Sequence, residues 1–430
     1  MSFDLPLFAL KKNKSIAFHT LGCKLNYAET STMQRMLQEA GYEKKSIQDE
    51  NDVIVINTCS VTENADKECH QLVRRFKSKN PEAKIIVTGC YAQLKPEKIA
   101  AIDGVNMVLG AGEKFNIVKH LEEDLEQKIY SCEIADVNQF TASYSLHDRT
   151  RTFLKVQDGC DYSCSFCTIP MARGGSRSDS IQGVLANIEE LHRAGVKEIV
   201  LTGINLGDFG KGHNGNKKND ENFLSLIQAI DKQGLISRFR ISSIEPNLLT
   251  DEIIQFVSAS KCFMPHFHIP LQSGTNKQLA AMRRRYKKEL YEERVLKIKS
   301  LMPHCCIGVD VIVGFPDETD ADFEATYRFL QELPISYLHV FTYSERENTL
   351  AATMPNTIPM SIRKERNNKL RILSEKKMNA FIQEHKGQER AVLFEHENSE
   401  HQLEGYTDNY IRIQTHFDKK RENTIVNWII

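Results

Sequence analysis

The chain has 430 residues, of which 41% are hydrophobic and 26% are charged, and its formal net charge at neutral pH is −1. The length predicts two or three domains, and the composition excludes a disordered chain. No window approaches the roughly 18 uninterrupted apolar residues of a membrane span, and the start of the chain has no signal-peptide pattern. We therefore expect a cytoplasmic protein with no membrane partner. Because the net charge is close to zero, any contact with a nucleic acid must come from local basic patches.

The first ~140 residues alternate strand-like and helix-like segments, which is typical of a parallel α/β domain. Amphipathic helical stretches are predicted at 31–40 and 66–79. Strands are predicted at 15–20, 53–57, 84–88 and 106–109. We assign residues 1–140 to this N-terminal α/β domain.

A polar linker at 138–150 is followed by six further β/α repeats, and a Gly-, Lys- and Asn-rich surface loop is predicted at 210–222. The strands are predicted at 151–157, 198–202, 238–243, 266–270, 307–313 and 337–341, with helices at 181–194, 251–258, 288–300 and 321–332. Six repeats are fewer than the eight of a complete barrel, so residues 146–378 are predicted to form an open partial (β/α)6 barrel.

The last part of the chain changes character after a basic helix predicted at 361–384. Short alternating segments follow it, at 390–395, 402–407, 410–414 and 425–430. This pattern predicts a small C-terminal β-barrel over residues 379–430.

The chain contains eleven cysteines. Their odd number and uneven spacing do not suggest a disulfide framework, so in a reducing compartment they are core thiols, catalytic thiols or metal ligands. Cys160, Cys164 and Cys167 follow the first strand of the barrel, and three thiolates at this spacing can hold an iron–sulfur cluster with one iron left open. Zinc is the alternative, but a structural zinc site takes four ligands and no fourth Cys or His stands nearby.

A second triplet becomes visible only through topology. Cys23, Cys59 and Cys90 each stand two or three residues past the end of a predicted N-terminal strand. Carboxyl ends of parallel strands open on one edge of a sheet, so the pattern predicts a second three-thiolate cluster site, with structural cysteines as the alternative. We expect the other five cysteines to be core residues: Cys69, Cys132, Cys262, Cys305 and Cys306.

The barrel triplet, with Phe166 before its last cysteine, resembles the signature of the radical S-adenosylmethionine superfamily. Together with the N-terminal triplet, it resembles the methylthiotransferase family of that superfamily, and the likeness runs over nearly the whole chain. The segments that carry it are TLGCKLN (20–26), INTC (56–59), TGC (88–90), QDGC (157–160), ARG (172–174), LTGIN (201–205), HIPLQSG (268–274) and DVIVGFP (310–316).

This resemblance implies two [4Fe–4S] clusters, S-adenosylmethionine and an external electron donor. Cys23, Cys59 and Cys90 would hold an auxiliary cluster that carries the sulfur, and Cys160, Cys164 and Cys167 the cluster that cleaves S-adenosylmethionine to a 5′-deoxyadenosyl radical. One S-adenosylmethionine would donate a methyl group and a second the radical, so no catalytic acid or base is nominated.

Candidate contacts to S-adenosylmethionine lie on the predicted carboxyl-terminal rim of the barrel, where barrel active sites are built. Ordinary loop polarity and helix capping are the alternative reading of these residues. The candidates are Phe166, Gly203, Asn205, Ser243, Glu245 and Gln272.

Members of the family act on threonylcarbamoyladenosine or isopentenyladenosine of tRNA, or on an aspartate of a ribosomal protein. Residues 22–26 and 284–286 resemble the first group, which predicts methylthiolation at C2 of N6-threonylcarbamoyladenosine, at position 37 of tRNA. The expected partner is therefore the anticodon stem-loop, bound by a monomer. An iron–sulfur electron carrier, the non-enzyme alternative, would need neither two open clusters nor a six-repeat barrel.

The C-terminal segment resembles the RNA-binding TRAM domain but has an unfavourable charge. Residues 381–430 contain six lysines and arginines against nine aspartates and glutamates. A general electrostatic grip on RNA is not expected there, although 419–421 and the neighbouring aromatic residues can form a local surface. The stronger candidates for phosphate contacts are Arg283, Arg284 and Arg285, for which a solvated helix surface is the alternative.

Overall fold

The computed structural model describes residues 14–60, 63–123, 127–146, 150–211, 221–398 and 400–430. It divides into two compact units, Met1–Val137 and Asn138–Ile430, which are treated separately below. Most of the loop predicted at 210–222 lies outside the described residues, as does part of the predicted linker. None of the described helices is both long and apolar enough to cross a membrane.

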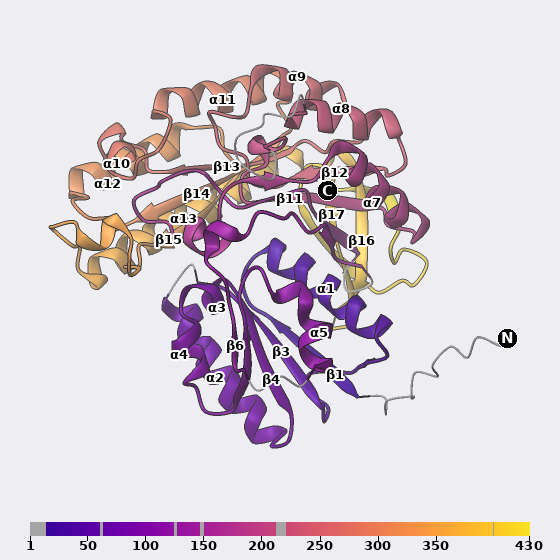
Figure 1. Ribbon diagram of the computed structural model, residues 1–430. Helices are drawn as coiled ribbons and strands as arrows, with labels where there is room; N and C mark the ends of the chain where they lie inside the picture. The colour runs from indigo at the N-terminus through magenta and orange to yellow at the C-terminus, as the bar shows by residue number, and fades with distance from the viewer. Residues whose placement is uncertain (1–13, 61–62, 124–126, 147–149, 212–220, 399) are drawn as a thin grey trace. The chain divides into compact units, whose positions relative to one another are not determined.

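The first unit is built on a six-stranded parallel sheet with the order β2-β1-β3-β4-β5-β6, which confirms the predicted parallel domain (Figure 1). Its strands are β1 (Ser15–Thr20), β2 (Glu43–Lys44), β3 (Val53–Thr58), β4 (Lys84–Gly89), β5 (Val105–Leu109) and β6 (Ile129–Tyr130). Its α-helices are α1 (Lys24–Glu39), α2 (Glu63–Lys79), α3 (Cys90–Leu94), α4 (Pro96–Ala100) and α5 (Ile117–Glu122). Short 3-10 turns lie at Lys114–Asn116 and Ile134–Asp136.

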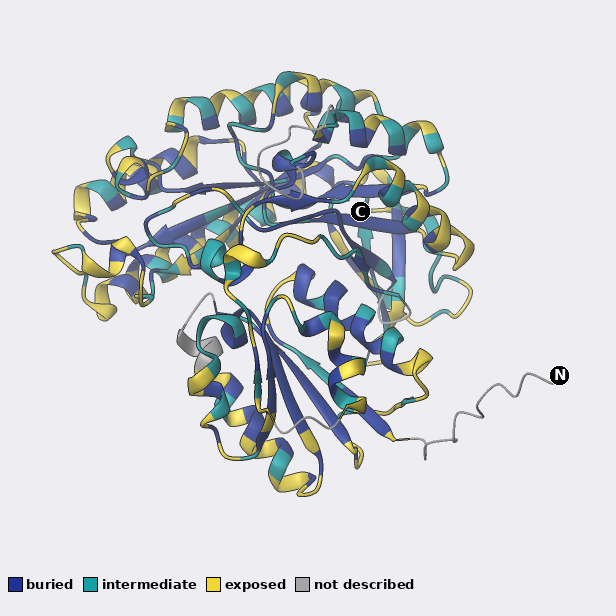
Figure 2. Ribbon diagram, viewed as in Figure 1, coloured by how far each residue is buried: buried dark blue, intermediate teal, exposed yellow. Residues whose placement is uncertain are grey.

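Both faces of this sheet are covered, which explains why its strands are apolar without alternation. Met33 and Leu37 of α1 pack on one face, whereas Val73 and Phe76 of α2 pack on the other. Every residue of β3 is buried in consequence (Figure 2). With both faces closed by helices, the carboxyl edge of the sheet is where loops can build a site.

The second unit contains six parallel strands in sequential spatial order, which confirms the open partial barrel. They are β8 (Arg151–Lys155), β11 (Glu198–Thr202), β12 (Arg238–Ile241), β13 (His266–Gln272), β14 (Cys306–Val313) and β15 (Tyr337–Thr342). Single bridges at Phe239–Phe263 and Ser243–His268 join β12 to the following ladder. Three short strands accompany them: β7 (Ser143–Tyr144), β9 (Gln157–Asp158) and β10 (Arg177–Ser178).

Helices cover the outer face of these strands (Figure 1). The long ones are α7 (Ile181–Arg193), α8 (Phe223–Gln233), α9 (Asp251–Ala259), α11 (Lys288–Leu301), α12 (Asp320–Glu332) and α13 (Met360–His385). The short ones are α6 (Ile169–Arg173) and α10 (Asn276–Ala281), with 3-10 turns at Leu206–Asp208 and Leu350–Thr353. Side chains of Ser180, Thr250 and Thr319 accept the N-terminal N–H bonds that set where α7, α9 and α12 begin.

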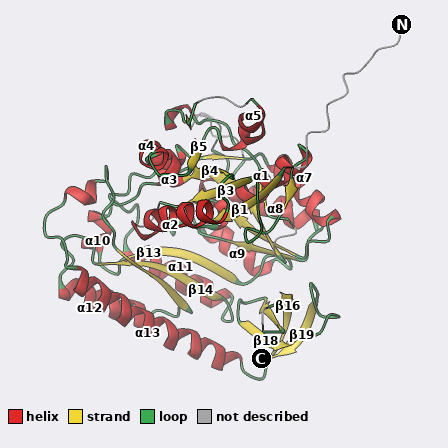
Figure 3. Cartoon of the chain, turned by 90° about the horizontal axis from the view of Figure 1, so that it is seen from below, coloured by secondary structure: helices red, strands yellow, loops and turns green. Residues whose placement is uncertain are grey.

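After α13 the chain forms a small antiparallel sheet with the order β18-β17-β16-β19, as the change of sequence pattern predicts (Figure 3). Its strands are β16 (Glu389–Glu397), β17 (Gln402–Thr407), β18 (Arg412–His416) and β19 (Ile425–Ile429). β18 begins two residues later than the sequence predicts because Tyr410 takes a positive φ in the turn that precedes it. The three-domain boundaries stay a prediction, since barrel and sheet belong to one compact unit.

Arginines at the amino-terminal end of the barrel strands hold this sheet. Arg238 donates to the carbonyls of Tyr406 and Ala391, and Arg240 donates to that of Thr407 at 2.7 Å. Glu198, which is fully buried, pairs with Arg240 at 2.8 Å. The C-terminal sheet therefore covers the end of the barrel opposite to the rim on which the candidate cofactor contacts were predicted.

Candidate functional site

The three barrel cysteines line one cavity of about 460 Å³, in the loop between β9 and α6. Each sulfur accepts one N–H hydrogen bond. Tyr162 N lies 3.4 Å from Cys160 Sγ and Ile169 N lies 3.5 Å from Cys167 Sγ. The third donor is Arg284 Nη1, which lies 3.1 Å from Cys164 Sγ. Donors of this kind stabilise thiolates, the form in which cysteine binds iron, so this donor set fits a cluster.

The backbone of this loop requires a glycine. Gly159 has a φ of +69°, and a Cβ added there would lie 1.9 Å from the carbonyl oxygen of Gly175. Cys160 N donates to the carbonyl of Gly174 at 3.0 Å, which fixes the start of the loop. Gly159 thus lets the first cysteine turn into the cavity directly after the strand.

A low pKa does not distinguish the candidate cluster ligands from the other cysteines, because burial raises the pKa of most of the thiols. Burial raises the pKa of Cys160 to about 12 and that of Cys167 to about 11. It raises the pKa of Cys262, outside the cavity, to about 12 as well. Metal binding must therefore displace thiol protons, and the shared cavity is what distinguishes the triplet.

The arrangement of the thiols bears on the zinc alternative. Across the part of the chain that the structure describes, no three His, Cys, Asp or Glu side chains are grouped to hold one metal ion. A tetrahedral zinc ion needs its ligands to converge on a single point. The barrel triplet supplies three thiols, one fewer than a structural zinc site takes and the number that leaves one iron of a cluster open.

Asn205 and Gly203 are brought to the cysteine loop by the amide of Gln157. Gln157 Oε1 accepts from Ile204 N at 2.8 Å and from Asn205 N at 2.9 Å. A Cβ at Gly203 would lie 2.9 Å from the same oxygen. Asn205 Oδ1 in turn accepts from Glu245 N at 3.4 Å, so β9 and the loops that follow β11 and β12 are joined at one corner of the rim.

Glu245 reaches the cysteine loop through Arg284. The Arg284 guanidinium binds the Glu245 carboxylate with one nitrogen and Cys164 Sγ with another. Burial raises the pKa of Glu245, and the neighbouring Arg284 only partly offsets this. Arg284 also donates to the hydroxyl of Tyr286, which donates to the carbonyl of Pro270 at 2.8 Å.

This contact set bears on the three arginines predicted as phosphate contacts, because it removes Arg284 from the surface. The Arg284 side chain is only 4% exposed, and its charge is already opposed by Glu245. Arg285 stays exposed, with its guanidinium 4.0 Å from the ring centroid of Tyr162. Arg283 is exposed and lines the cavity. Two of the three arginines thus remain open to a ligand.

The other predicted contacts lie apart from the cavity wall. Phe166 packs edge-on against Phe315 with 6.4 Å between ring centroids. Ser243 forms a backbone bridge to His268, and Gln272 has a φ of +72° beside an irregularity in the β13–β14 ladder. The structure places these three residues around the rim, and their contact with S-adenosylmethionine stays a prediction.

The sequence analysis missed a buried charge cluster beneath the cysteine loop. Asp158 lies 2.9 Å from Arg173, 3.3 Å from Arg177 and 3.4 Å from Lys155. All four side chains are less than one-tenth exposed. Polar residues in the QDGC and ARG segments, next to a buried strand, were the signal that could have found it. The cluster ties β8, β9 and α6 together and so supports the loop.

Inside the barrel, a second missed group joins strands β13, β14 and β15. His268 Nε2 lies 2.7 Å from Asp310 Oδ1, and the rings of His268 and His339 stack with 5.1 Å between centroids. These residues face the barrel lumen, because their neighbours Ile269, Val309 and Leu338 point to the opposite side, into the core shared with the helices. Polar residues at alternate positions of an otherwise apolar strand, as in 266–270, indicate such a lining.

The N-terminal triplet follows three neighbouring strands, as predicted. Cys23 comes after β1, Cys59 after β3 and Cys90 at the start of α3 after β4. Gly22, with a φ of +98°, packs so tightly that an added Cβ would lie 2.7 Å from Cys59 Cβ and 3.0 Å from Cys59 Sγ. The first two cysteine loops are therefore in contact at the carboxyl edge of the sheet.

Buried asparagines and glycines hold these loops. Asn26 Nδ2 donates to the carbonyls of Leu21 at 2.8 Å and Thr58 at 3.0 Å, bridging the ends of β1 and β3. Gly89 also has a φ of +98°, and an added Cβ would lie 2.3 Å from Thr58 O. Cys23 is exposed, Cys59 is half-buried and Cys90 is buried, so the triplet runs from the surface into the protein.

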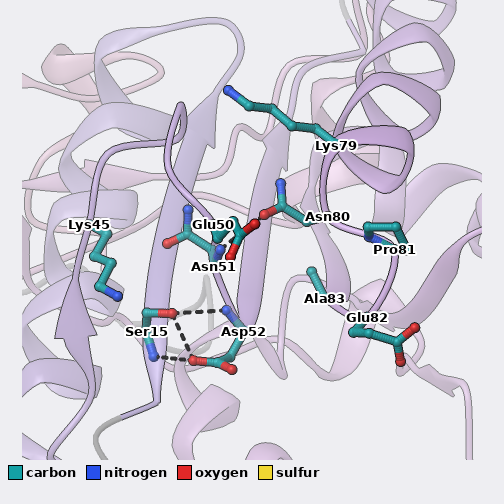
Figure 4. Close-up of a pocket in the computed structure, with 10 residues that line it drawn as sticks. All are labelled: Ser15, Lys45, Glu50, Asn51, Asp52, Lys79, Asn80, Pro81, Glu82 and Ala83. Atoms are coloured by element: carbon teal, nitrogen blue, oxygen red, sulfur yellow. Dashed lines mark hydrogen bonds between the residues drawn. The ribbon is translucent and has the colours of Figure 1, made fainter.

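The opposite edge of this sheet carries a polar hollow of about 380 Å³ that contains no cysteine (Figure 4). Both the N–H and the hydroxyl of Ser15 donate to Asp52 Oδ2 at 2.7 Å (Figure 4). Asp52 N donates back to Ser15 Oγ at 3.0 Å. These bonds tie together the amino ends of β1 and β3, away from the cysteine edge.

The five remaining cysteines follow neither pattern. Cys69, Cys305 and Cys306 are buried, as expected of core residues, whereas Cys132 and Cys262 are half-buried. Cys262 Sγ donates to Asp231 Oδ1 at 3.1 Å. Their placement leaves the two triplets as the candidate ligand sets.

Comparisons with known proteins agree with this architecture. Residues 15–110 match the uncharacterized protein family UPF0004, and residues 154–330 match the radical SAM superfamily. Threonylcarbamoyladenosine tRNA methylthiotransferase MtaB of Bacillus subtilis (strain 168) is 39% identical over 416 residues, 93% of this chain and 90% of that protein. MtaB of Aquifex aeolicus (strain VF5) is 38% identical, covering 93% of this chain and 96% of that protein.

A relative with another printed substrate and a solved structure are also similar. The tRNA-2-methylthio-N(6)-dimethylallyladenosine synthase of Clostridium novyi (strain NT) is 32% identical, over 83% of this chain and 80% of that protein. The radical S-adenosylmethionine methyltransferase TsrM from Kitasatospora setae, solved with cobalamin and a [4Fe-4S] cluster, matches with a TM-score of 0.57. It is 13% identical over 79% of this chain and 77% of that one, a likeness of fold alone.

The matched relatives cover both the N-terminal sheet and the barrel, and so take in both cysteine triplets. The chain therefore belongs to the radical S-adenosylmethionine tRNA methylthiotransferases, enzymes that use S-adenosylmethionine and [4Fe–4S] clusters.

Proposed function

We propose that this enzyme methylthiolates C2 of N6-threonylcarbamoyladenosine at position 37 of tRNA, in the anticodon stem-loop. The observation that carries the proposal is the similarity over nine-tenths of the chain to two proteins named for that substrate, at 38–39% identity. The dimethylallyladenosine relative is less similar, at 32% identity. The sequence segments around Gly22 and Tyr286 point to the same substrate.

Two sets of residues are proposed to hold the clusters. Cys160, Cys164 and Cys167 share the cavity and each accept an N–H bond, and the open position among three ligands leaves room for S-adenosylmethionine. Cys23, Cys59 and Cys90, on the carboxyl edge of the other sheet, are proposed to hold the auxiliary cluster. Together the clusters and S-adenosylmethionine supply radical and sulfur-transfer chemistry.

The side chains around the cavity are proposed to position the cysteine loop and the S-adenosylmethionine contacts, and no proton transfer is assigned to them. Gln157 and Asn205 fix the loops at the ends of β8 and β11, and Asn205 reaches the backbone of Glu245. Arg284 keeps a positive charge against Cys164 and holds the Glu245 carboxylate. Asn205 and Glu245 are therefore proposed as contacts to S-adenosylmethionine, with Gly203, Ser243, Gln272 and Phe166 around them.

RNA contacts are proposed at exposed cations. Arg283 lines the cavity and Arg285 is exposed above the ring of Tyr162, whereas Arg284 is buried by its partners. In the C-terminal sheet, Tyr410 stacks on His266 of the barrel with 4.2 Å between ring centroids. This ring is thus occupied within the protein, and the proposed RNA surface there is the exposed turn with Lys419 and Lys420.

A direct test compares substrates in vitro. Anaerobically reconstituted enzyme is mixed with S-adenosylmethionine, an external reductant and one of three substrates. These are stem-loop RNAs with threonylcarbamoyladenosine or isopentenyladenosine, and ribosomal protein. The proposal predicts that a methylthio product, detected by mass spectrometry, forms on the first RNA. A product only on the second RNA or on ribosomal protein would refute the substrate assignment.

A further inference from the structure

Arg283 occupies a backbone position that favours glycine. It follows the last turn of α10 and has a φ of +57°. Its N–H donates to Ala280 O at 3.0 Å, and Arg284 N–H donates to Leu279 O at 2.9 Å. This pair of bonds defines a helix end whose left-handed residue is usually glycine, since a Cβ is strained there. An arginine at such a position points to a use for its side chain.

The side chain stands on the wall of the cavity that contains the three barrel thiols. Asn348, with a φ of +65°, lines the same cavity. Residues held in the left-handed region cluster at ligand sites, because surrounding structure must keep them there. Arg283 and Asn348 are two such residues on one wall of the cavity.

Arg283 also carries a positive charge that can bind a ligand in the cavity. Arg284 is paired with Glu245, and Arg285 lies over Tyr162 and donates to the carbonyl of Asp161. Among the residues that the structure describes, no carboxylate forms an ion pair with Arg283. The Arg283 guanidinium can therefore bind an anion without first breaking an ion pair within the protein.

We infer that Arg283 binds the threonine carboxylate of N6-threonylcarbamoyladenosine and is a specificity-determining residue. The inference rests on the proposed function. The planar guanidinium fork matches a carboxylate with two parallel hydrogen bonds. A dimethylallyl group carries no charge and would leave Arg283 without this partner. A cavity-wall position suits the modified base better than the phosphate backbone, which would meet cations on the outer surface.

The test uses the reconstituted holoenzyme and two stem-loop RNAs. One carries threonylcarbamoyladenosine, and the other carries the same group with its carboxylate replaced by a neutral carboxamide. Arg283→Gly suits this test, because glycine adopts the left-handed conformation at this helix end without strain, so we expect the variant to keep its fold. Arg283→Lys retains the charge but not the fork, and Arg193→Gln, an exposed arginine on α7, is the matched control.

For the acid RNA we expect Arg283→Gly to lower kcat/KM by roughly 10- to 100-fold, and Arg283→Lys by less. For the carboxamide RNA, wild type and Arg283→Gly should agree within about threefold. The melting temperature of Arg283→Gly should not fall, and cleavage of S-adenosylmethionine without RNA should be unchanged. Arg193→Gln should behave as wild type.

Several outcomes would overturn the inference. An equal loss on both RNAs would place Arg283 on a phosphate, and a loss of RNA-independent cleavage would place it on the S-adenosylmethionine carboxylate. If wild-type enzyme has the same kcat/KM on the acid and the carboxamide RNA, the proposed role of Arg283 is wrong, but the proposed function is not affected. A wild-type enzyme inactive on the acid RNA would instead overturn the proposed function, and the inference with it.

Discussion

Arg284 Nη1 donates a hydrogen bond to Cys164 Sγ at 3.1 Å. The guanidinium is almost fully buried and is held from the other side by Glu245. A hydrogen bond and a positive charge at a ligand sulfur stabilise the reduced, more negative form of a cluster. Through this hydrogen bond, Arg284 is expected to influence the reduction potential of the cluster proposed at Cys164, which stands 120 positions earlier in the chain.

Arg284→Met is expected to lower the reduction potential of the barrel cluster, because it removes both the hydrogen bond and the charge. Glu245→Gln should raise the potential, because the charge of Arg284 loses its counter-ion. Redox titration followed by electron paramagnetic resonance, without S-adenosylmethionine, measures both shifts. Arg285→Met is the control, since Arg285 bonds to a carbonyl and not to sulfur. Unchanged potentials in both variants would show that this contact does not tune the cluster.

Gly22→Ala should disturb the auxiliary site. The new Cβ would lie 2.7 Å from Cys59 Cβ, which forces that cysteine to move. Gly41 is a matched control, because its φ is +89° and no atom lies within 4 Å of an added Cβ. We expect Gly22→Ala to retain roughly half of the reconstituted iron and Gly41→Ala to retain all of it. Iron and sulfide analysis with Mössbauer spectroscopy measures this, and full loading of Gly22→Ala would argue against the proposed ligand loop.

Arg240→Met should destabilise the second unit strongly. Glu198 is fully buried and Arg240 is 2% exposed, so the substitution leaves a buried carboxylate without its main partner. The expected loss in the free energy of unfolding is about 3–5 kcal/mol. Arg240→Met combined with Glu198→Met should recover the part that comes from the unpaired carboxylate, but not the hydrogen bond to the carbonyl of Thr407. Urea denaturation of Arg240→Met, Glu198→Met and the double variant completes the double-mutant cycle. A loss below about 1 kcal/mol would mean that the pair contributes little.

The same contacts change how the C-terminal sheet can be studied. Arg238 and Arg240 donate to carbonyls of that sheet, so its removal would expose buried charge at the end of the barrel. Substitution of Lys419 and Lys420 is a cleaner way to probe RNA binding there than deletion of 381–430.

The capping box of α12 supplies a pH-dependent contribution to stability. Burial would raise the pKa of Asp322, but hydrogen bonds from Lys277 and Thr319 outweigh it and lower the pKa. A lowered pKa stabilises the folded state above the usual titration range of aspartate, and this contribution is lost as the pH falls through the folded-state pKa. Asp322→Asn should therefore cost about 1 kcal/mol at neutral pH.

Thermal unfolding of wild type and Asp322→Asn from about pH 6 to about pH 2, a range that passes below the usual pKa of aspartate, checks the sign. The gap between the two melting temperatures should narrow as the pH falls. A gap that stays constant would indicate that the lost hydrogen bonds, and not the carboxylate charge, set the difference.

Local patterns predicted most of the main elements and both cysteine triplets. The strand prediction at 15–20 matches β1 residue for residue, because buried parallel strands are short apolar runs with polar ends. The helix predicted at 31–40 begins seven residues earlier, since Cys23 is its N-cap and hides the start signal. The placement of Cys23, Cys59 and Cys90 after neighbouring strands follows from topology, because parallel strands bring their following loops to one edge. Their role as cluster ligands stays a prediction.

Contacts between distant segments could not be predicted. Arg284 reads as part of an exposed basic run, yet its partners stand 39 and 120 positions away. Tyr406 and Tyr410 are two of the aromatic residues expected near 419–421 in a local RNA surface, but the Arg151 guanidinium of the barrel lies over both of their rings. Such pairings depend on how whole elements pack, and no local spacing encodes them.

The central claim is most directly tested by nucleoside mass spectrometry of tRNA from a strain that lacks this gene. The account predicts that 2-methylthio-N6-threonylcarbamoyladenosine disappears and that N6-threonylcarbamoyladenosine accumulates. Wild-type protein should restore the product. Variants lacking either cysteine triplet should not, whereas replacement of Cys69 and Cys132 by Ser should restore it. Unchanged amounts of the methylthio nucleoside in the deletion strain, or restoration by a triplet variant, would contradict the account.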